Sequence, residues 1–294
     1  MRQQLNKTVK KLFKKDKKIF LILGDIGVYG FKDLLKDKRA VNIGILEQAT
    51  ISFAAGLAKV GFIPVVHTIA TFMIGRAFEQ LKLDFGYNQL NGNFVSVGAS
   101  YDYAALGCSH HCPEDINLLK NIPNMQIVVP GNSYEFDRLF IESYSKKLPK
   151  YFRLSSEENK KKLNVKFGKG IILNQGKIVT VIAVGPVLNM AYDICKKLNV
   201  NLVYYTTIRP FDSNAIKKLK IKTKKVLIIE PFYTGSVTEE VIKCYNNSKI
   251  QIENISIPYK FLTNYGVKKE HDKKLGFTKN NFEIKLKKLM KNKI

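Results

Sequence analysis

Short apolar runs, rich in β-branched residues, alternate with segments of helical periodicity along most of this chain of 294 residues. A strand, a helix and a second strand in succession form a parallel pair joined by a crossover, so this order predicts an α/β fold with parallel or mixed sheets. In the first half we expect strands at 18–24, 62–68, 93–98 and 125–129 and helices at 47–59, 71–88, 114–121 and 133–145.

The alternation is interrupted once, near the middle of the chain. Residues 155–169 are polar and rich in lysine without a clear period, which is typical of a linker. The alternation then restarts, with strands expected at 178–184, 202–207, 225–229 and 250–257 and helices at 186–198, 213–219, 234–246 and 280–291. We therefore predict two α/β domains, over residues 1–158 and 172–294, joined by a linker at 159–171.

The chain is strongly basic, with 49 Lys and Arg against 24 Asp and Glu and a net charge of +25. Such a charge suits a nucleic-acid or membrane partner. The basic residues are scattered, however, and are not interleaved with aromatic residues in one binding element, so we favour a lysine-rich surface and expect neither partner. An acidic partner subunit or an anionic substrate is compatible with the charge, and a non-catalytic basic interaction module stays open as an alternative.

The apolar runs are too short for a membrane span, which needs about 20 residues. The run 19–23 is followed directly by Asp25 and by no small-residue cleavage signal, so we interpret it as a buried strand and not as a signal peptide. The four cysteines form no regular framework, which suits a reducing compartment. We therefore expect a cytoplasmic protein.

One acid stands out in the segment 42–48, where Glu47 lies among apolar residues and opens a run of small residues. A carboxylate is costly to bury without a partner. Such an acid is either a member of a structural ion pair or a group that handles protons in a functional site. The residues alone leave both interpretations open.

Other candidate residues are equally ambiguous on spacing alone. The segment 108–112 holds two Cys and two His, but zinc sites usually draw ligands from two separated segments, and no second pair stands out, so we expect no metal site in this chain. Phe72 and Phe78 have the spacing of core aromatics, and Arg76 suits an ion pair. Asp25 follows a strand, where acids often cap turns.

Taken in order, several segments resemble the C-terminal half of transketolase, which comprises the pyrimidine-binding domain and the C-terminal domain. The matching segments are Asp25, 42–48, 54–58, 72–80, 109–110, 114–115, 123–125, 128–130, 151–154, 183–185 and 208–212. The same architecture occurs in deoxyxylulose-phosphate synthases and in beta subunits of 2-oxo-acid dehydrogenases.

The resemblance implies thiamine diphosphate as the cofactor, whose chemistry protein groups tune. It places Glu47 beside N1′ of the aminopyrimidine and makes His110 the active-site histidine that faces the substrate. It also implies that Phe72 packs against the pyrimidine ring with help from Phe78. Arg76 either lines the cofactor pocket, orients the neighbouring Glu79 or forms a structural ion pair.

The resemblance also brings Asp25 to the thiazolium side of the site, and it shows what this chain lacks. The family's motif for the diphosphate and Mg²⁺ is missing, so we expect a split enzyme. A separate N-terminal diphosphate-binding subunit would hold most of the diphosphate and Mg²⁺ contacts, in an α2β2 heterotetramer around a homodimer core. This chain would be active only with that partner.

Two further departures concern the substrate. Leu106 stands where the family carries an acid that reads a sugar hydroxyl, and Ser155 and Ser156 stand where it often carries an arginine that clamps the sugar phosphate. We therefore expect a small sugar substrate other than an ordinary sugar phosphate, such as one with a nucleotide or another group attached.

The favoured function is thus transfer of a two-carbon ketol unit by the C-terminal catalytic subunit of a split transketolase-like enzyme. A 2-oxo-acid dehydrogenase or decarboxylase beta subunit, or an enzyme similar to deoxyxylulose-phosphate synthase, is the alternative within enzymes. Donor, acceptor and pathway do not follow from the sequence.

Overall fold

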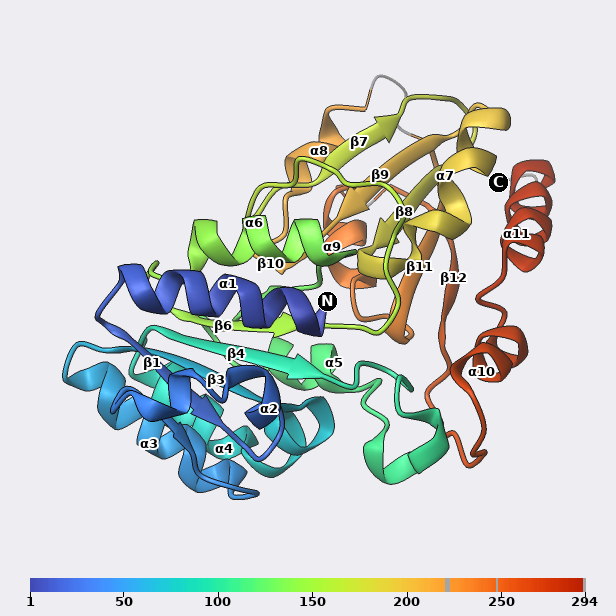
Figure 1. Ribbon diagram of the computed structural model, residues 1–294. Helices are drawn as coiled ribbons and strands as arrows, with labels where there is room; N and C mark the ends of the chain where they lie inside the picture. The colour runs from blue at the N-terminus through green and yellow to red at the C-terminus, as the bar shows by residue number, and fades with distance from the viewer. Residues whose placement is uncertain (220–222, 247, 293–294) are drawn as a thin grey trace.

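The computed structural model describes residues 1–219, 223–246 and 248–292, which form two β-sheets with helices packed around them (Figure 1). The larger sheet has seven strands in the order β10-β5-β6-β4-β3-β1-β2, and the smaller has five in the order β12-β11-β8-β9-β7. Neighbouring strands pair in parallel, except β10 with β5 and β7 with β9. The predicted α/β fold on two mixed sheets is therefore confirmed.

The strands are short and mostly buried on both faces, as parallel strands covered by helices are. The larger sheet consists of β1 (Ile19–Leu23), β2 (Ala40–Asn42), β3 (Ile63–Ile69), β4 (Gly92–Val97), β5 (Gln126–Val128), β6 (Pro149–Arg153) and β10 (Thr207–Arg209). The smaller sheet consists of β7 (Ile171–Asn174), β8 (Thr180–Val184), β9 (Asn201–Tyr205), β11 (Lys225–Tyr233) and β12 (Gln251–Ile257). The expected single strand at 202–207 is thus divided, because the chain leaves the smaller sheet after β9 and pairs with β5 of the larger one.

Helices connect the strands and cover the sheets (Figure 1). They are α1 (Arg2–Lys15), α2 (Val28–Phe31), α3 (Glu47–Lys59), α4 (Phe78–Gln80), α5 (Asp115–Lys120), α6 (Ser133–Ser143), α7 (Leu188–Lys197), α8 (Ser213–Lys217), α9 (Thr238–Lys243), α10 (Lys268–Leu275) and α11 (Lys279–Lys291). None of those in the described ranges combines the length and the apolar character needed to span a bilayer.

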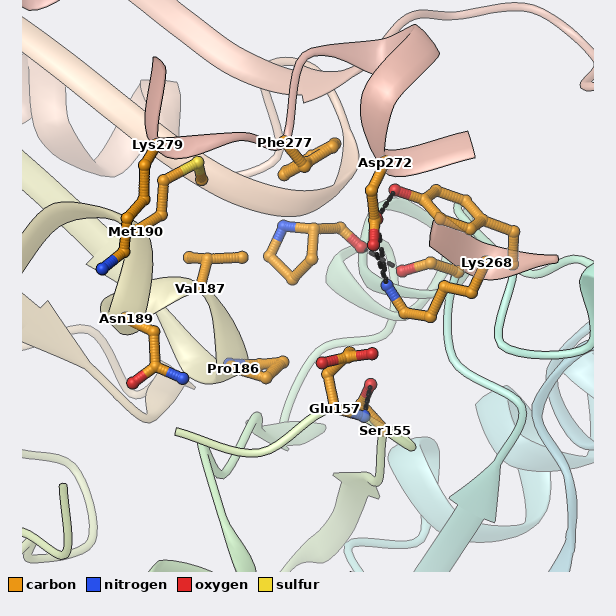
Figure 2. Close-up of a pocket in the computed structure, with 13 residues that line it drawn as sticks. Ser155, Glu157, Pro186, Val187, Asn189, Met190, Lys268, Asp272, Phe277 and Lys279 are labelled. Carbon is orange, nitrogen blue, oxygen red and sulfur yellow. Dashed lines mark hydrogen bonds and ion pairs between the residues drawn. The ribbon is translucent and has the colours of Figure 1, made fainter. Parts of the chain in front are cut away.

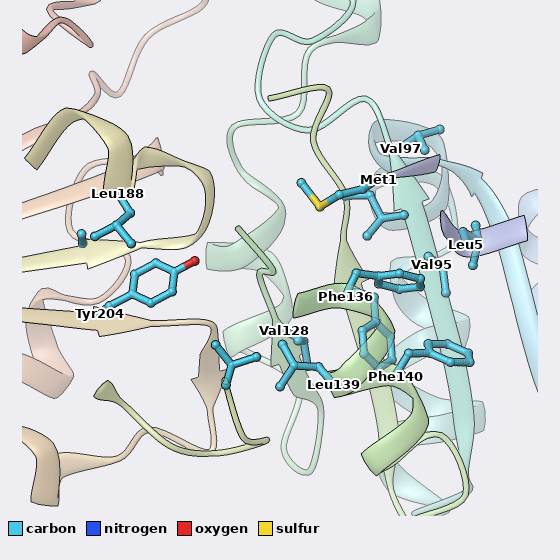
Figure 3. Close-up of a cluster of buried hydrophobic side chains, with 14 of the residues drawn as sticks. Met1, Leu5, Val95, Val97, Val128, Phe136, Leu139, Phe140, Leu188 and Tyr204 are labelled. Carbon is cyan, nitrogen blue, oxygen red and sulfur yellow. The ribbon is translucent and has the colours of Figure 1, made fainter. Parts of the chain in front are cut away.

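The apolar core is continuous between the two sheets. Figure 3 shows one cluster in which Val128, Phe136 and Phe140 from the first part of the chain lie with Leu188 and Tyr204 from the second. All five side chains are at most 1% exposed. The two units therefore share buried surface, which limits their movement relative to each other.

The segment expected as one helix at 71–88 differs from that prediction. It contains two stretches of wide, π-type turns, at Phe72–Arg76 and Leu81–Tyr87, on either side of the short α4. Ala77 leaves the helical region between them, with φ −112° and ψ 24°. Wide turns of this kind insert an extra residue into a helix and are frequent at functional sites. Phe72 and Arg76 belong to the first of them.

Several elements had no counterpart in the predictions, namely α1, α2, β2, β6, β7 and α10, and α1 and β6 are the most deeply packed of the longer ones. Helix α1 buries Leu5, Val9 and Leu12 at helical spacing and packs on α6, while its many lysines face away from the core. Strand β6 lies between β4 and β5 and is buried along its length. Neither α1 nor β6 shows a clear apolar pattern in the sequence, because α1 carries many lysines and β6 begins with Pro149 and Lys150.

The parallel strands direct one set of segments to a single edge of the larger sheet. Strands β1, β3, β4 and β6 pair in parallel, so their carboxyl ends lie at the same edge. Asp25 follows β1, Glu47 follows β2, Phe72 follows β3, the loop 98–112 follows β4, and Ser155 follows β6. Ligands of open α/β sheets bind outside the carboxyl ends of the strands. This edge is therefore the candidate site.

Candidate functional site

Glu47 is the first residue of α3, and its side chain is only 5% exposed. The chain turns from β2 into this helix through Gly44, whose φ of +85° favours glycine. Arg76 donates from Nη1 to Glu47 Oε2 across 3.1 Å, and 46% of the Arg76 side chain is exposed. The buried carboxylate thus has a cationic partner at its outer side and the positive end of a helix beneath it.

Phe72 links this ion pair to His110. The Arg76 guanidinium lies 4.0 Å from the centre of the Phe72 ring, in a cation–π contact. The Phe72 and His110 rings meet edge to face with centroids 5.1 Å apart. Glu47, Arg76, Phe72 and His110 therefore form one continuous row, although they come from three separate segments. We call these four residues the Glu47–His110 row.

His110 lies in a single 3₁₀ turn, Cys108–His110, within the loop that follows β4. Its Nδ1 is 3.0 Å from Ser109 Oγ, and the Tyr103 ring lies edge to face with centroids 6.2 Å apart. Gly107 opens this turn at φ +71° and ψ −164°, and a Cβ there would lie 2.6 Å from Tyr265. This conformation is essentially restricted to glycine, so Gly107 helps to fix where His110 stands.

Asp25 and Phe78 do not join the row. Asp25 is exposed, with φ +62°, and its backbone N–H donates to Asn42 Oδ1 across 2.8 Å. Among the described residues, no hydrogen bond or ring contact joins Asp25 to Glu47 or His110. Phe78 is half-buried and packs against the core. In the described part of the chain, it makes no ring contact with Phe72 or His110.

A buried ion pair that was not predicted as such anchors the His110 loop. Arg153 at the end of β6 donates from Nε to Asp115 Oδ2 across 2.6 Å, and the two side chains are 1% and 0% exposed. Arg153 also donates from Nη2 to Ser100 Oγ and to the Cys112 carbonyl oxygen, at 3.0 and 3.2 Å. Burial alone lowers the pKa of Arg153, but the Asp115 carboxylate raises it above its ordinary value. The arginine thus holds both ends of the loop.

The sequence carried a weak signal for this pair. A charged residue inside the apolar run Tyr151–Leu154 needs a buried partner. In the sequence, Asp115 stood out only as part of the matching segment 114–115, and its pairing with Arg153 became clear once the fold placed β6 beside it. Tyr151 also donates to Asp115 Oδ2, across 2.7 Å.

The second unit holds the same loop from its other side. Asp272 of α10 accepts from the Tyr101 hydroxyl across 2.6 Å and from Lys268 across 3.0 Å (Figure 2). The His111 and His271 rings meet edge to face at 5.6 Å, and burial, together with His271 and His110, lowers the pKa of His111. The imidazole of His111 is therefore neutral near pH 7.

The segment 108–112 does not gather its Cys and His side chains around one point. Cys108 is exposed and Cys112 is buried, and both are free thiols. In the ranges that the structure describes, no group of three or more His, Cys, Asp or Glu side chains is arranged to hold a metal ion.

Comparison with known proteins gives consistent matches over the chain. The model of the transketolase pyrimidine-binding domain matches residues 1–161, and that of the transketolase C-terminal domain matches residues 168–281. An uncharacterized 33.6 kDa protein in the fasciation locus of Rhodococcoides fascians is 35% identical over 77% of this chain and 74% of its own length.

Two further matches cover nearly the whole chain. An apulose-4-phosphate transketolase subunit of Phocaeicola vulgatus is 28% identical over 92% of this chain and 94% of its own length. A solved structure of a split gene transketolase, described as an inactive beta4 tetramer, superposes with a TM-score of 0.84 at 24% identity, over 98% of this chain and 97% of that one. This last match concerns the fold alone.

Proposed function

This chain belongs to the transketolase family, and we propose that it is the pyrimidine-binding, catalytic subunit of a split enzyme that transfers a two-carbon ketol unit. The observation that supports this proposal most directly is the Glu47–His110 row, which joins a buried acid, an aromatic face and a histidine at the carboxyl edge of the larger sheet. The row contains Glu47, Phe72 and His110, which the resemblance implies for the site, and Arg76, whose role the sequence left open and which pairs with Glu47.

The residues of the row fit thiamine diphosphate. An aminopyrimidine has a flat apolar face and ring nitrogens, and the site offers a half-buried Phe72 ring and a buried Glu47 carboxylate. When bound, thiamine diphosphate supplies an electron sink for carbanion chemistry. The cofactor would lie against the Phe72 ring, with Glu47 toward the pyrimidine nitrogen.

Each side chain then has a defined task in our proposal. Glu47 holds and shares a proton at the pyrimidine nitrogen, in a site where little water reaches the carboxylate. Arg76 positions Glu47 and stacks on Phe72. His110 donates a hydrogen bond to the substrate oxygen on which charge develops. Phe78 supports this wall from the core, and Asp25 marks the edge toward the thiazolium.

The proposal includes a partner. The relative from Phocaeicola vulgatus is named as one subunit of a transketolase and matches this chain over 94% of its length, which supports a split arrangement. We propose an N-terminal diphosphate-binding subunit that holds Mg²⁺ and the diphosphate, as the resemblance implies, in an α2β2 assembly. The substrate is proposed to be a small sugar.

The test is reconstitution of the full chain with a candidate diphosphate-binding subunit, followed by a screen of ketose donors with thiamine diphosphate and Mg²⁺. Glu47→Gln should lower kcat by at least about 100-fold, because a positioned acid–base group contributes ~10²–10⁴-fold. Assembly with the partner should be unchanged. Retention of more than about a tenth of the activity would contradict the role of Glu47.

A matched control is Glu283→Gln in α11. Glu283 pairs with Lys287 at 2.6 Å on the surface, far in the chain from the row. The substitution removes the same charge without touching the site, so activity should stay within about twofold of the unmodified enzyme.

A further inference from the structure

A small hollow of about 160 Å³ lies beside the row, at the carboxyl ends of β4 and β6. Gly98, Asp102, Tyr103, Ser155 and Ser156 line it, and Met1 and Arg2 of the N-terminal segment form its rim. Tyr103 belongs both to this hollow and to the surroundings of His110, since the two rings are 6.2 Å apart. The hollow therefore lies one aromatic ring away from His110.

The hydrogen bonds inside the hollow converge on one carboxylate. Ser155 Oγ and Ser156 Oγ both donate to Asp102 Oδ1, at 3.2 and 2.9 Å. The Ser156 backbone N–H donates to Asp102 Oδ2 at 2.8 Å. Three donors that a phosphate group could have used are thus already committed to Asp102.

Apart from Arg2 at the rim, the hydrogen-bonding atoms that stay available in the hollow are mainly acceptors. Ser156 Oγ keeps its lone pairs, whereas Ser155 Oγ already accepts from the Glu157 backbone N–H across 3.1 Å. An ionised carboxylate has about four acceptor sites, of which three are filled here. A ligand with hydroxyl groups can donate to these atoms. A phosphate dianion brings only acceptors and a charge that the carboxylate repels.

The cationic groups near this hollow do not reverse its preference for hydroxyl groups over a phosphate. The N-terminal ammonium of Met1 is paired with Glu158. Arg2 also lines the hollow, but it is exposed, so water and salt screen its charge more than that of the half-buried Asp102. Lys268, which shares the neighbouring hollow with Ser155, is held by both carboxylate oxygens of Asp272, at 3.0 and 3.3 Å (Figure 2).

We propose that Asp102, with Ser155 and Ser156, selects an acceptor whose far end is uncharged and carries hydroxyl groups, and excludes an acceptor with a phosphate at that position. This inference rests on the proposed ketol transfer. It identifies Asp102 as a specificity-determining residue and gives the substrate class as a polyhydroxylated carbonyl compound without a terminal phosphate.

The test uses the full chain assembled with its diphosphate-binding subunit and compares kcat/KM for erythrose and erythrose 4-phosphate as acceptors. The unmodified enzyme should favour erythrose by at least about tenfold. The double variant Asp102→Asn/Ser156→Arg should move the ratio at least about 100-fold toward the phosphate. Because the ratio is compared between variants, intrinsic differences between the two aldehydes cancel.

Two controls accompany this comparison. Asp102→Asn alone removes the charge with little change of shape, and it should move the ratio in the same direction by a smaller factor. Asp33→Asn removes an exposed acid that pairs with Lys10, and the ratio should not change. Donor consumption without acceptor is measured in all four proteins, and it should be equal in the unmodified enzyme and in Asp33→Asn.

A preference of the unmodified enzyme for erythrose 4-phosphate, or an unchanged ratio in both Asp102 variants with normal donor consumption, would overturn the inference. Absence of donor consumption in every protein would count against the proposed function instead. In that case, binding to the assembled protein is measured with erythritol and with inorganic phosphate as probes. Tighter binding of erythritol, reversed in the double variant, supports the inference, and tighter binding of phosphate to the unmodified protein overturns it.

Discussion

Asp115→Asn removes the carboxylate charge that neutralises Arg153 and leaves the shape of the side chain almost unchanged. Arg153 is 1% exposed and Asp115 is 0% exposed, so water cannot easily replace the lost charge. The guanidinium keeps its bonds to Ser100 and to the Cys112 carbonyl oxygen, but both of these acceptors are neutral. The variant therefore buries a cation without an anionic partner.

Removing one member of a buried ion pair costs about 3–5 kcal/mol. Asparagine can still accept one hydrogen bond from Arg153 Nε, so we expect a loss near the lower bound, about 3 kcal/mol. This is a large share of the ~5–15 kcal/mol that stabilises an ordinary domain. At roughly 2 °C per kcal/mol for a chain of this size, Tm should fall by about 6 °C.

The assay is urea unfolding of the purified chain, followed by circular dichroism because the sequence contains no Trp to report by fluorescence. Glu283→Gln serves as the comparison, since it breaks a surface pair with Lys287 and should leave the unfolding midpoint almost unchanged. A loss below about 1 kcal/mol in Asp115→Asn would refute the reasoning, because it would mean that Arg153 finds solvent or another anion in the folded state. Asp115→Asn should also lower activity, since Arg153 holds the His110 loop.

Three further predictions concern other parts of the fold. Burial raises the pKa of the Glu135 carboxyl from 4.5 to about 7, so between these pH values the folded state binds more protons than the unfolded state, and stability falls as pH rises. Glu135→Gln should therefore be more stable than the unmodified chain at pH 8, by at most about 3 kcal/mol, and should differ little from it at pH 4. Tm at the two pH values measures this difference. Leu5→Ala should cost about 2–5 kcal/mol in urea unfolding, because Leu5 lies on the buried face of α1 and is fully buried; a cost below about 1 kcal/mol would mean that α1 is not docked. Gly107→Ala should cost ~1–3 kcal/mol and reduce kcat, because its backbone conformation excludes a side chain and Tyr265 occupies the space; unchanged kcat would show that His110 does not depend on this turn.

The long, regular patterns of the sequence were sufficient to predict most elements. The helix expected at 47–59 is present with those bounds, and the expected strands at 62–68 and 93–98 appear as β3 and β4 within one residue at each end. In these segments the secondary-structure preference of the residues agrees with the pattern of burial, so tertiary contacts did not change the structure that the local sequence favours.

The missed elements have mixed local signals. Helix α1 carries few apolar residues among many lysines, and it is held in place mainly by packing on α6. Strand β10 is three residues long and pairs with β5, far from it in the chain. Pairings of this kind depend on which segments the rest of the fold brings together, and local periodicity does not encode them.

The candidate site likewise contains residues that the sequence predicted and one that it did not. Glu47, Phe72, Arg76 and His110 were named from an ordered set of motifs, and the fold brings all four into one row. Asp102 was not singled out, because an acid in a loop has no distinctive pattern. Only its contacts with Ser155 and Ser156 across the sheet edge show what it does.

By itself, the sequence determined the α/β class, the boundaries of its most regular elements and the residue types available for chemistry, because these depend on periodicity and composition within short segments. The tertiary structure alone decided which charged groups meet. Arg153 forms an ion pair with Asp115, and Arg76 forms one with Glu47. Ser155 and Ser156 donate hydrogen bonds to Asp102. These contacts form because the parallel strands end at one edge of the sheet and bring distant segments together there. The free energy that a charged group contributes depends on its burial and on its neighbours, and both are properties of the folded chain.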